Sequence, residues 1–516
     1  MAAEWRTKME LKKETVRLCS TIIKGTTQAM AEGDVNVPDI KPDILKILQV
    51  DADAYITDKY IENGRLVISG RAEYKVLYVP DKENERIKSI LTSMEFRQTV
   101  DANGASPDAT VIADASVERV EFSAVNSRKL RLRAIIHLDY EVCRTEDHDI
   151  CTGVEENTAE CSMAVMTFEN VSDISEHTFT LKETLEVPSG QSSIGEILKT
   201  DVKISDTEHK TVTGKIIVKG NVGICILYTD DDNEIKFIEA EVPFTEVLDA
   251  ENVREDTICD IDYNVVGVMT EAEKDSDGDM RIAAIDIDIS ASVRGSEPVE
   301  LETLEDCFIP YSGTECKKET IMLNNIVERP ISQNTIREII DFPSNAPEVG
   351  GIYNVMTNSV ITKSELQHSR LICEGRIEAY VLYLTNNAEN PVYSIKKDIP
   401  FSYMIECENA GGEGDIELKA EVKHVSYNLN SSGELELRCL LAIDGKLTEK
   451  VEFQNITDIE SADREAKHGI VICFAREGDS LWDIAKRYAI PQDKIVKYNS
   501  IEENKITKGT KLFIPA

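Results

Sequence analysis

Three stretches of the sequence share one pattern, a glycine followed by strand-forming residues and a closing Leu-Tyr pair. They are Gly70-Arg-Ala-Glu-Tyr-Lys-Val-Leu-Tyr78, Gly220-Asn-Val-Gly-Ile-Cys-Ile-Leu-Tyr228 and Gly375-Arg-Ile-Glu-Ala-Tyr-Val-Leu-Tyr383. The glycines lie 150 and 155 residues apart. A proline stands 32 residues before each glycine and a phenylalanine 24 to 26 residues after it, namely Pro38, Pro188 and Pro343, and Phe96, Phe244 and Phe401. Because these landmarks recur three times in one order, the sequence predicts three copies of one folding unit.

Apolar and polar residues alternate with a period of two inside each unit. The clearest examples close the units, at residues 130–138, 280–289 and 435–443. A period of two puts successive side chains on opposite faces, as in a half-buried strand. Polar clusters rich in Gly, Asn and Asp separate these runs and are typical of turns. The predicted fold class is therefore mainly β, with tandem antiparallel β-sandwich or barrel-like repeats.

Two further features subdivide the chain. Apolar residues at 42–48 and 193–198 follow the repeated proline at helix-like spacing, so we expect a short helix at each place. Boundaries between units are expected near 165–178, 310–335 and 455–468. The predicted domains are then a first β domain with an N-terminal extension (1–165), a second (175–310), a third (335–455) and a distinct C-terminal domain (469–516).

The last 48 residues differ from the rest in charge and pattern. From Gly469 onward, six Lys and two Arg stand against three Asp and three Glu, a net charge of +2 that leaves −40 for residues 1–468. The pattern predicts a strand at 470–474, helices at 480–488 and 491–498, and a strand at 511–515, with Ser480 as the N-cap of the first helix. This small α+β (βααβ) domain is expected to orient independently of the acidic body, because the polar residues 458–468 join the two.

Composition excludes several classes of protein. The chain has 516 residues, 57 Lys plus Arg against 95 Asp plus Glu, and a formal charge of −38, which repels nucleic acid and anionic lipid. No uncharged apolar run approaches the roughly 18 to 20 residues of a membrane helix. The first 17 residues are charged throughout and lack the apolar core of a secretory signal, so we expect the protein to stay in the cell that makes it.

Cysteine and histidine usage gives no sign of a metal site. The 12 cysteines are scattered singly, without a CxxC pair, and are expected to be reduced, mostly buried side chains. Oxidative cross-linking is the alternative if the protein ends in a durable extracellular assembly. The seven histidines show no metal-like pairing, and no GxSxG, P-loop, HExxH or GxGxxG string occurs. We therefore expect no cofactor, no metal and no enzymatic activity.

Two parts of the sequence resemble known families. The string Arg476-Glu-Gly-Asp-Ser-Leu-Trp-Asp-Ile-Ala-Lys-Arg-Tyr488, with Lys494-Ile-Val-Lys-Tyr-Asn499 and Ile506-Thr-Lys-Gly-Thr-Lys-Leu-Phe-Ile-Pro515, closely resembles the LysM domain. The repeats, with Ala31-Glu-Gly-Asp-Val-Asn-Val-Pro-Asp-Ile-Lys-Pro-Asp-Ile-Leu-Lys-Ile-Leu48 ahead of the first, resemble the SPOCS domain of clostridial spore-coat proteins. SPOCS repeats followed by a LysM domain are the arrangement of SipL-like spore-coat morphogenetic proteins.

The resemblance implies a function and a partner. SipL-like proteins act in the mother-cell cytoplasm at the forespore surface, where the LysM domain contacts the coat basement-layer ATPase (SpoIVA-like). The protein would then be a scaffold that also recruits other coat proteins through its repeats, with self-association as a further possibility. LysM domains commonly hold N-acetylglucosamine polymers, so the alternative is a peptidoglycan-binding wall or cortex protein. An undetected hydrolase is a third class.

The residues expected to bind the partner or the glycan lie on two loops of the LysM-like segment. They are Gly478, Asp479, Ser480, Leu481, Trp482, Asn504, Lys505 and Ile506. Each also has a simpler interpretation. Trp482 is equally well explained by packing, and Asp479 by a role in the turn and at the helix N-terminus.

Overall fold

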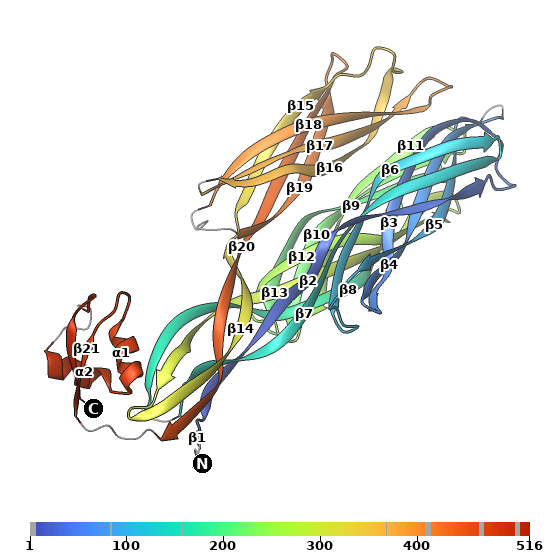
Figure 1. The fold of residues 1–516 in the computed structure, drawn as a ribbon. Coiled ribbons are helices and arrows are strands. Elements are labelled where there is room, and N and C mark those ends of the chain that lie inside the picture. Colours follow the sequence, from blue (N-terminus) through green and yellow to red (C-terminus); the bar gives the residue numbers. More distant parts are fainter. Residues whose placement is uncertain are drawn as a thin grey trace.

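The computed structural model describes residues 7–82, 85–155, 158–367, 369–407, 414–463, 469–500 and 506–515. Figure 1 shows three bundles of long strands, which converge toward a narrow end where the N-terminus lies beside a small C-terminal domain. The prediction of a mainly β chain with a short helical segment near the C-terminus is confirmed.

The first repeat is a pair of three-stranded antiparallel sheets packed face to face. Their strand orders are β2-β7-β6 and β3-β4-β5. The strands are β2 (Leu11–Asn36), β3 (Ile44–Glu62), β4 (Arg65–Pro80), β5 (Lys88–Asp101), β6 (Thr110–Asn126) and β7 (Lys129–Val154).

The second and third repeats have the same topology. In the second repeat the strand orders are β8-β13-β12 and β9-β10-β11. In the third repeat one sheet has the order β16-β17-β18, and in the other β15 and β19 flank β20. The second repeat contains β8 (Glu160–Glu186), β9 (Ile194–Val212), β10 (Lys215–Asp230), β11 (Ile235–Asp249), β12 (Ile258–Lys274) and β13 (Met280–Phe308). The third contains β14 (Ser312–Glu328), β15 (Ile331–Ile340), β16 (Val349–Gln367), β17 (Arg370–Thr385), β18 (Val392–Glu406), β19 (Gly414–Leu429) and β20 (Leu435–Asp463). Strand β1 (Thr7–Lys8) pairs with β20.

The repeated glycine and phenylalanine are cross-strand partners. Gly70 lies opposite Phe96, and the same pairing joins the glycine and phenylalanine of the other two repeats. A Cβ atom on Gly70 would lie 2.3 Å from Cζ of Phe96 and 2.4 Å from the carbonyl oxygen of Tyr55. The glycine is therefore required because the aromatic ring lies across its backbone.

The Leu-Tyr pair divides its two side chains between two cores. Neighbouring residues of a strand point to opposite faces. The tyrosines are fully buried inside their own repeats, and Tyr78 donates a hydrogen bond to the Pro42 carbonyl at 3.1 Å. The leucines, Leu77, Leu227 and Leu382, meet in one apolar cluster at the centre of the three repeats, which we call the junction.

A buried charge network closes the junction. The Lys199 side chain is 1% exposed and lies between Asp51 of the first repeat and Asp201 of its own. The Tyr353 hydroxyl of the third repeat donates to Asp201 at 3.2 Å, while Lys75 lies 3.5 Å from the same carboxylate. Burial alone would lower the pKa of Lys199, but the two carboxylates outweigh it and raise the pKa. All three repeats thus meet in one paired, hydrogen-bonded network.

The predicted helices at 42–48 and 193–198 are wrong, because these residues begin strands β3 and β9. The repeated proline starts a turn instead, with the Lys41 amide donating to the Pro38 carbonyl at 2.9 Å. The β3–β4 register then shifts between Ile44 and Lys46 and again between Ile47 and Gln49. Each bulge adds a residue to the strand, so the apolar residues recur at three- and four-residue spacing and imitate a helix.

Long strands of each repeat continue past its core and form a shared trunk. The trunk consists of residues 11–21 with 143–154, 160–172 with 296–308, and 312–328 with 447–463, one antiparallel pair from each repeat. Its interior is apolar and takes residues from all three pairs, including Val16, Leu18, Ile150, Phe168, Leu301, Leu323 and Phe453. Strands therefore run through the boundaries predicted from the sequence, since β8 is continuous across 165–178 and β14 and β15 occupy most of 312–340.

Candidate partner-binding site

The C-terminal domain consists of β21 (Ile470–Phe474), α1 (Leu481–Tyr488), α2 (Gln492–Asn499) and β22 (Lys511–Pro515). This is the βααβ order predicted from the sequence. Ser480 caps α1 in a capping box, because its side chain accepts from the Asp483 amide while the Asp483 side chain accepts from the Ser480 amide. Leu481, Ile484 and Ala485 of α1 pack with Leu512 and Ile514 of β22 in the domain core.

Asp479 is used inside the domain. Its carboxylate accepts from the Arg476 amide at 2.9 Å and from two nitrogens of Arg487, at 2.6 and 3.1 Å. These hydrogen bonds, chiefly the pair from Arg487, lower the pKa of Asp479 to about 2. The interpretation of Asp479 as a residue of the turn and helix N-terminus agrees with this geometry.

The two predicted loops lie side by side. The Gly509 amide donates to the Ala475 carbonyl at 2.8 Å, and Lys508 pairs with Glu477 at 2.7 Å. Of the predicted binding residues, Gly478 and Ser480 are on the first loop, whereas Leu481 is buried and Ile506 packs against the domain core. Asn504 and Lys505 lie outside the described residues.

Trp482 faces the trunk. Its ring packs edge-on against Phe308 at the end of β13, with ring centroids 5.2 Å apart, and its Nε1 donates to the Asp306 carboxylate at 3.1 Å. Lys486 also donates to Asp306, at 2.7 Å. Burial raises the pKa of Asp306, but the hydrogen bonds from Lys486 and Trp482 outweigh burial and lower it. Trp482 thus packs against the trunk, and its role in binding a partner stays a prediction.

Helix α2 adds a second contact to the trunk. Lys494 donates to the Tyr311 hydroxyl at 2.6 Å, and the Tyr311 amide donates to the Ala489 carbonyl at 2.7 Å. We call Asp306, Phe308 and Tyr311 the seat of the LysM-like domain. The expectation that this domain orients independently is therefore wrong, because α1 and α2 are held on the seat by an ion pair, an aromatic contact and hydrogen bonds.

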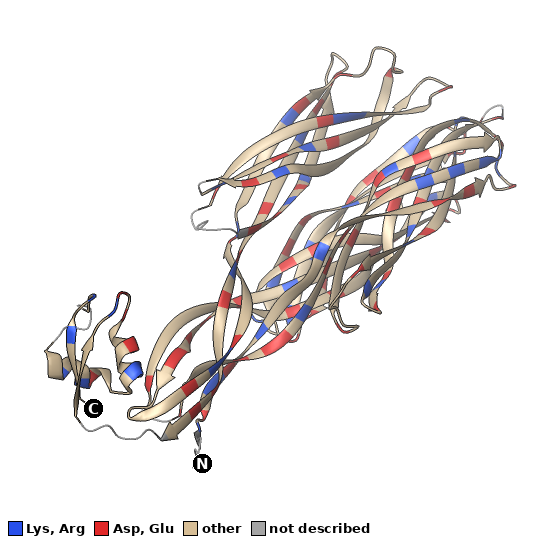
Figure 2. Ribbon diagram, viewed as in Figure 1, with Lys and Arg blue, Asp and Glu red and all other residues tan. Residues whose placement is uncertain are grey.

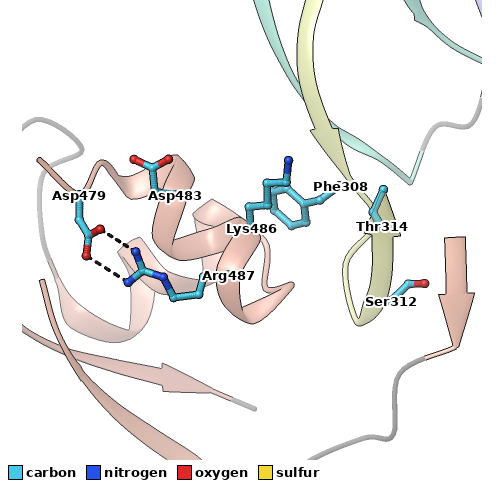
Figure 3. A pocket seen from close by; sticks show the side chains of 7 residues that line it. All are labelled: Phe308, Ser312, Thr314, Asp479, Asp483, Lys486 and Arg487. Carbon is cyan, nitrogen blue, oxygen red and sulfur yellow. Dashed lines mark hydrogen bonds and ion pairs between the residues drawn. The ribbon is translucent and has the colours of Figure 1, made fainter. Parts of the chain in front are cut away.

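A small cavity lies beside the seat (Figure 3). It has a volume of about 500 Å³, and its polar lining includes the ion pair of Asp479 and Arg487. The residues around it are Phe308, Ser312, Thr314, Asp479, Asp483, Lys486 and Arg487. Charged groups in this lining already have partners in the chain, so the cavity is bounded by structural contacts.

The opposite side of the C-terminal domain is an exposed apolar surface that sequence reasoning missed. Strands β21 and β22 bury Cys473, Leu512 and Ile514 against the helices. The alternate residues face out and form the outward face, which consists of Ile470 (63% exposed), Ile472 (51%), Phe474 (61%) and Phe513 (40%). The signal was present in the sequence, because Ile-Val-Ile-Cys-Phe is apolar at every position although helices cover only one face.

Two protein-family models match parts of this chain. The SipL SPOCS domain model matches residues 43–125, 193–273 and 348–430, and the LysM domain model matches residues 475–515. The chain is thus a tandem SPOCS-repeat protein with a C-terminal LysM domain. This is the SipL-like architecture of spore-coat proteins, and it places the protein in a sporulation context with a wall-binding type of module.

Similarity to individual proteins is limited. An uncharacterized protein of Chlamydia pneumoniae is 32% identical over 88 residues, which cover 17% of this chain and 20% of that protein. The chain therefore matches about one fifth of the length of that relative. The structure of the ferric yersiniabactin uptake receptor FyuA from Yersinia pestis aligns with 86% of this chain and 80% of the receptor at 8% identity and a TM-score of 0.10.

The described residues point to binding. SPOCS and LysM families are non-catalytic binding domains. Within the described part of the chain, no three His, Cys, Asp or Glu side chains are grouped so that they could hold a metal ion. The helices among the same residues are all too short or too polar to cross a membrane.

Proposed function

We propose that the protein is a non-enzymatic scaffold and adaptor of the spore coat. Its LysM domain docks on the coat basement-layer ATPase at the forespore surface, on the mother-cell side, and its β repeats recruit other coat components. The observation that carries this proposal is the outward face of the LysM domain, an apolar surface at the narrow end of the molecule.

The outward face is well placed for a protein partner. The helices rest on the seat, so the sheet on their other side faces away from the trunk (Figure 1). Its four apolar side chains remain exposed in the whole chain. A cluster of exposed apolar residues on one face is typical of an interaction surface. Lys511 lies 4.8 Å above the Phe513 ring and adds a positive charge to that surface.

Charge supports docking through the LysM domain. Acidic and basic residues are interspersed along the strands of the body (Figure 2), whose net charge of −40 contrasts with +2 for residues 469–516. An acidic partner is repelled by the body and meets the least repulsion at the LysM domain. The charge difference therefore favours approach to the narrow end.

The experiment compares full-length variants for capture by immobilised coat basement-layer ATPase. Ile472→Asp places a charge in the middle of the outward face and should weaken capture by about 1–3 kcal/mol, the effect of losing one interface anchor. Met404→Asp is the matched control, because Met404 is exposed to a similar degree (59%) but lies on the third repeat. Equal capture of both variants and the wild type would show that docking does not use the outward face.

Recruitment by the repeats is the second part of the proposal. Strands β6 and β12 are edge strands of their sheets and carry exposed Phe122, Val125 and Met269. An edge strand has unpaired backbone groups that can pair with another chain. These edges are the surfaces we assign to coat components and to weak self-association.

Glycan binding by the LysM domain is the second candidate function. LysM domains bind N-acetylglucosamine polymers such as peptidoglycan. The observation in its favour is the contact between the loops of Ala475 and Gly509, with open space around Gly478. Sedimentation of the full-length protein with insoluble peptidoglycan tests it. Soluble N-acetylglucosamine oligomers should release the protein from the sediment and leave capture by the ATPase unchanged.

A further inference from the structure

Four cysteine thiols gather at the tip of the trunk, beside the seat of the LysM domain. Cys151, Cys161, Cys307 and Cys316 share one apolar cluster with Leu304, Ile456 and Ile459. They come from β7, β8, β13 and β14, so all three pairs of trunk strands contribute. None of the four is in a disulfide. Cys161 and Cys307 are cross-strand partners, whereas Cys307 and Cys316 lie on β13 and β14, on either side of a short connection.

Cys307 and Cys316 are the pair with sulfur atoms in contact. Their Sγ atoms are 3.7 Å apart, and the Cys316 thiol donates to the Cys307 carbonyl at 3.6 Å. A disulfide requires a separation of about 2.05 Å, so each sulfur has to move by less than about 1 Å. Neighbouring strands of one connection tolerate such a movement by small side-chain rotations.

The two thiols have different chemical characters. Cys316 is partly exposed, and a hydrogen bond from Cys307 lowers the pKa of its thiol to about 7. Burial and the Asp306 carboxylate act against this shift, while the Lys486 ammonium supports it. Cys307 is fully buried, and its pKa is raised by the same pairing and by burial. A lowered pKa favours the thiolate form of Cys316, which is the nucleophilic form of cysteine.

We propose that Cys307 and Cys316 are an oxidisable dithiol that hydrogen peroxide converts into an intramolecular disulfide. The Cys316 thiolate attacks one peroxide oxygen, the O–O bond breaks, and the departing oxygen takes up a proton and leaves as water, so that Cys316 becomes a sulfenic acid. The Cys307 sulfur then attacks the Cys316 sulfur. The S–O bond breaks, the Cys307 proton goes to the leaving hydroxide, and a second water is released. The two thiols lose two electrons and two protons, and the peroxide is reduced.

The link would act on the LysM domain through the seat. Asp306 and Phe308 flank Cys307 in the chain, and Tyr311 lies in the connection between β13 and β14. These three residues hold Trp482, Lys486 and Lys494. A Cys307–Cys316 disulfide ties the two ends of this connection together and therefore fixes the surface on which the LysM domain rests.

Peptide mapping of the full-length protein after treatment with hydrogen peroxide tests the proposal. The reduced protein is oxidised, remaining thiols are alkylated, and the digest is analysed with and without a reductant. We expect a peptide linking Cys307 to Cys316 and a loss of about 2 Da for the two hydrogens, both reversed by dithiothreitol. Cys316→Ser should abolish the link. Cys439→Ser should retain it, because Cys439 is buried like Cys307 but lies in the third repeat, and burial raises its pKa to about 11.

The wild-type digest decides the matter without reliance on a variant that folds poorly. Absence of any intramolecular link after oxidation overturns the proposal. A link between Cys307 and Cys161 also overturns it, since the pairing would follow strand register and not sulfur contact. A loss of about 2 Da corresponds to one disulfide. If the Cys316→Ser protein still showed this loss after oxidation, other thiols would carry the reaction.

Discussion

The three repeats and the trunk are built from the same strands but hold together differently. The core of each repeat comes from one stretch of chain, residues 29–142, 187–293 or 340–443. The trunk clusters combine residues from Met9 to Ile459. Strand β7 shows the contrast within one element, because Leu132 and Ile136 belong to the first repeat whereas Ile150 belongs to the trunk. A single strand can therefore serve two cores, one of local and one of distant contacts.

This difference predicts how the molecule loses structure. A change inside a repeat removes contacts among residues close in sequence, so its effect stays within that repeat. A change in the trunk removes contacts that join all three repeats, and closing the trunk requires the ends of the chain to come together.

Phe168→Ala should destabilise the trunk by about 3–5 kcal/mol, the usual cost of removing a buried aromatic ring. Phe168 is fully buried, and its ring lies 5.3 Å from that of Phe453 in an edge-on contact between β8 and β20. Hydrogen exchange should therefore increase in the trunk strands of all three repeats. The control is Ile377→Ala, which empties a buried position of the third repeat alone. If both variants gave exchange confined to one repeat, the trunk would not be a cooperative unit.

Gly220→Ala should cost about 1–3 kcal/mol, as overpacking does in a filled core. The new Cβ atom would lie 2.7 Å from the Phe244 ring and 3.2 Å from the Thr207 methyl group. Gly223→Ala in the same strand is the matched control, because its nearest neighbour would be the Lys203 carbonyl oxygen at an ordinary 3.7 Å. Urea titrations measure both. Equal urea midpoints for the two variants would show that contact with the Phe244 ring does not require glycine at position 220.

Local features of the fold were predictable from the sequence because their causes are local. The alternating strands that close each unit and the capped helix at Ser480 each depend on residues within about one hairpin or one turn. The two short helices were mispredicted for an equally local reason, since bulges at Ile44 and Ile47 give a strand the apolar spacing of a helix. The domain divisions themselves stay a prediction.

Distant contacts could not be predicted in the same way. Val16, Phe168 and Leu323 meet in the trunk, but each lies in a different repeat, two of them in segments that read as boundaries. Trp482 contacts Asp306 across 176 residues, and nothing in the spacing of either residue indicates the other. The binding residues on the two loops were placed by resemblance, whereas the outward face needed knowledge of which side of β21 the helices cover.

Asp306→Asn should weaken the contact between the seat and the LysM domain by about 1–2 kcal/mol. The substitution replaces the charged acceptor of Lys486 with a neutral amide, while the hydrogen bond from Trp482 persists. In a Trp5→Phe background, Trp482 is the only tryptophan, and its fluorescence should shift to longer wavelength as it leaves Phe308. Asp286→Asn, which removes an ion pair with Lys182 inside the second repeat, is the control and should leave the spectrum unchanged.

Acid should have the same effect on the seat as this substitution. The pKa of Asp306 is lower in the folded protein than in the unfolded chain, where a carboxyl titrates near about 3.9. Its contribution is therefore complete above roughly pH 4 and is lost as the pH falls through the folded pKa. The Trp482 fluorescence of the Trp5→Phe protein should shift in that acid range, and the shift should be absent in Asp306→Asn. An identical acid transition in both proteins would show that another group controls the seat.

Self-association is the smallest effect, and it tests whether the edge strands of the repeats behave differently from their central strands. A body with a net charge of −40 repels its copies at low salt, while the edge strands β6 and β12 offer unpaired backbone and exposed apolar residues. Screening shortens the repulsion to about 8 Å at 0.15 M salt, so the average mass from light scattering should rise modestly with ionic strength. Phe122→Glu on the β6 edge should reduce this rise, whereas Tyr380→Glu on β17, a central strand of its sheet, should not. A constant monomer mass at every salt concentration would mean that assembly depends wholly on another protein.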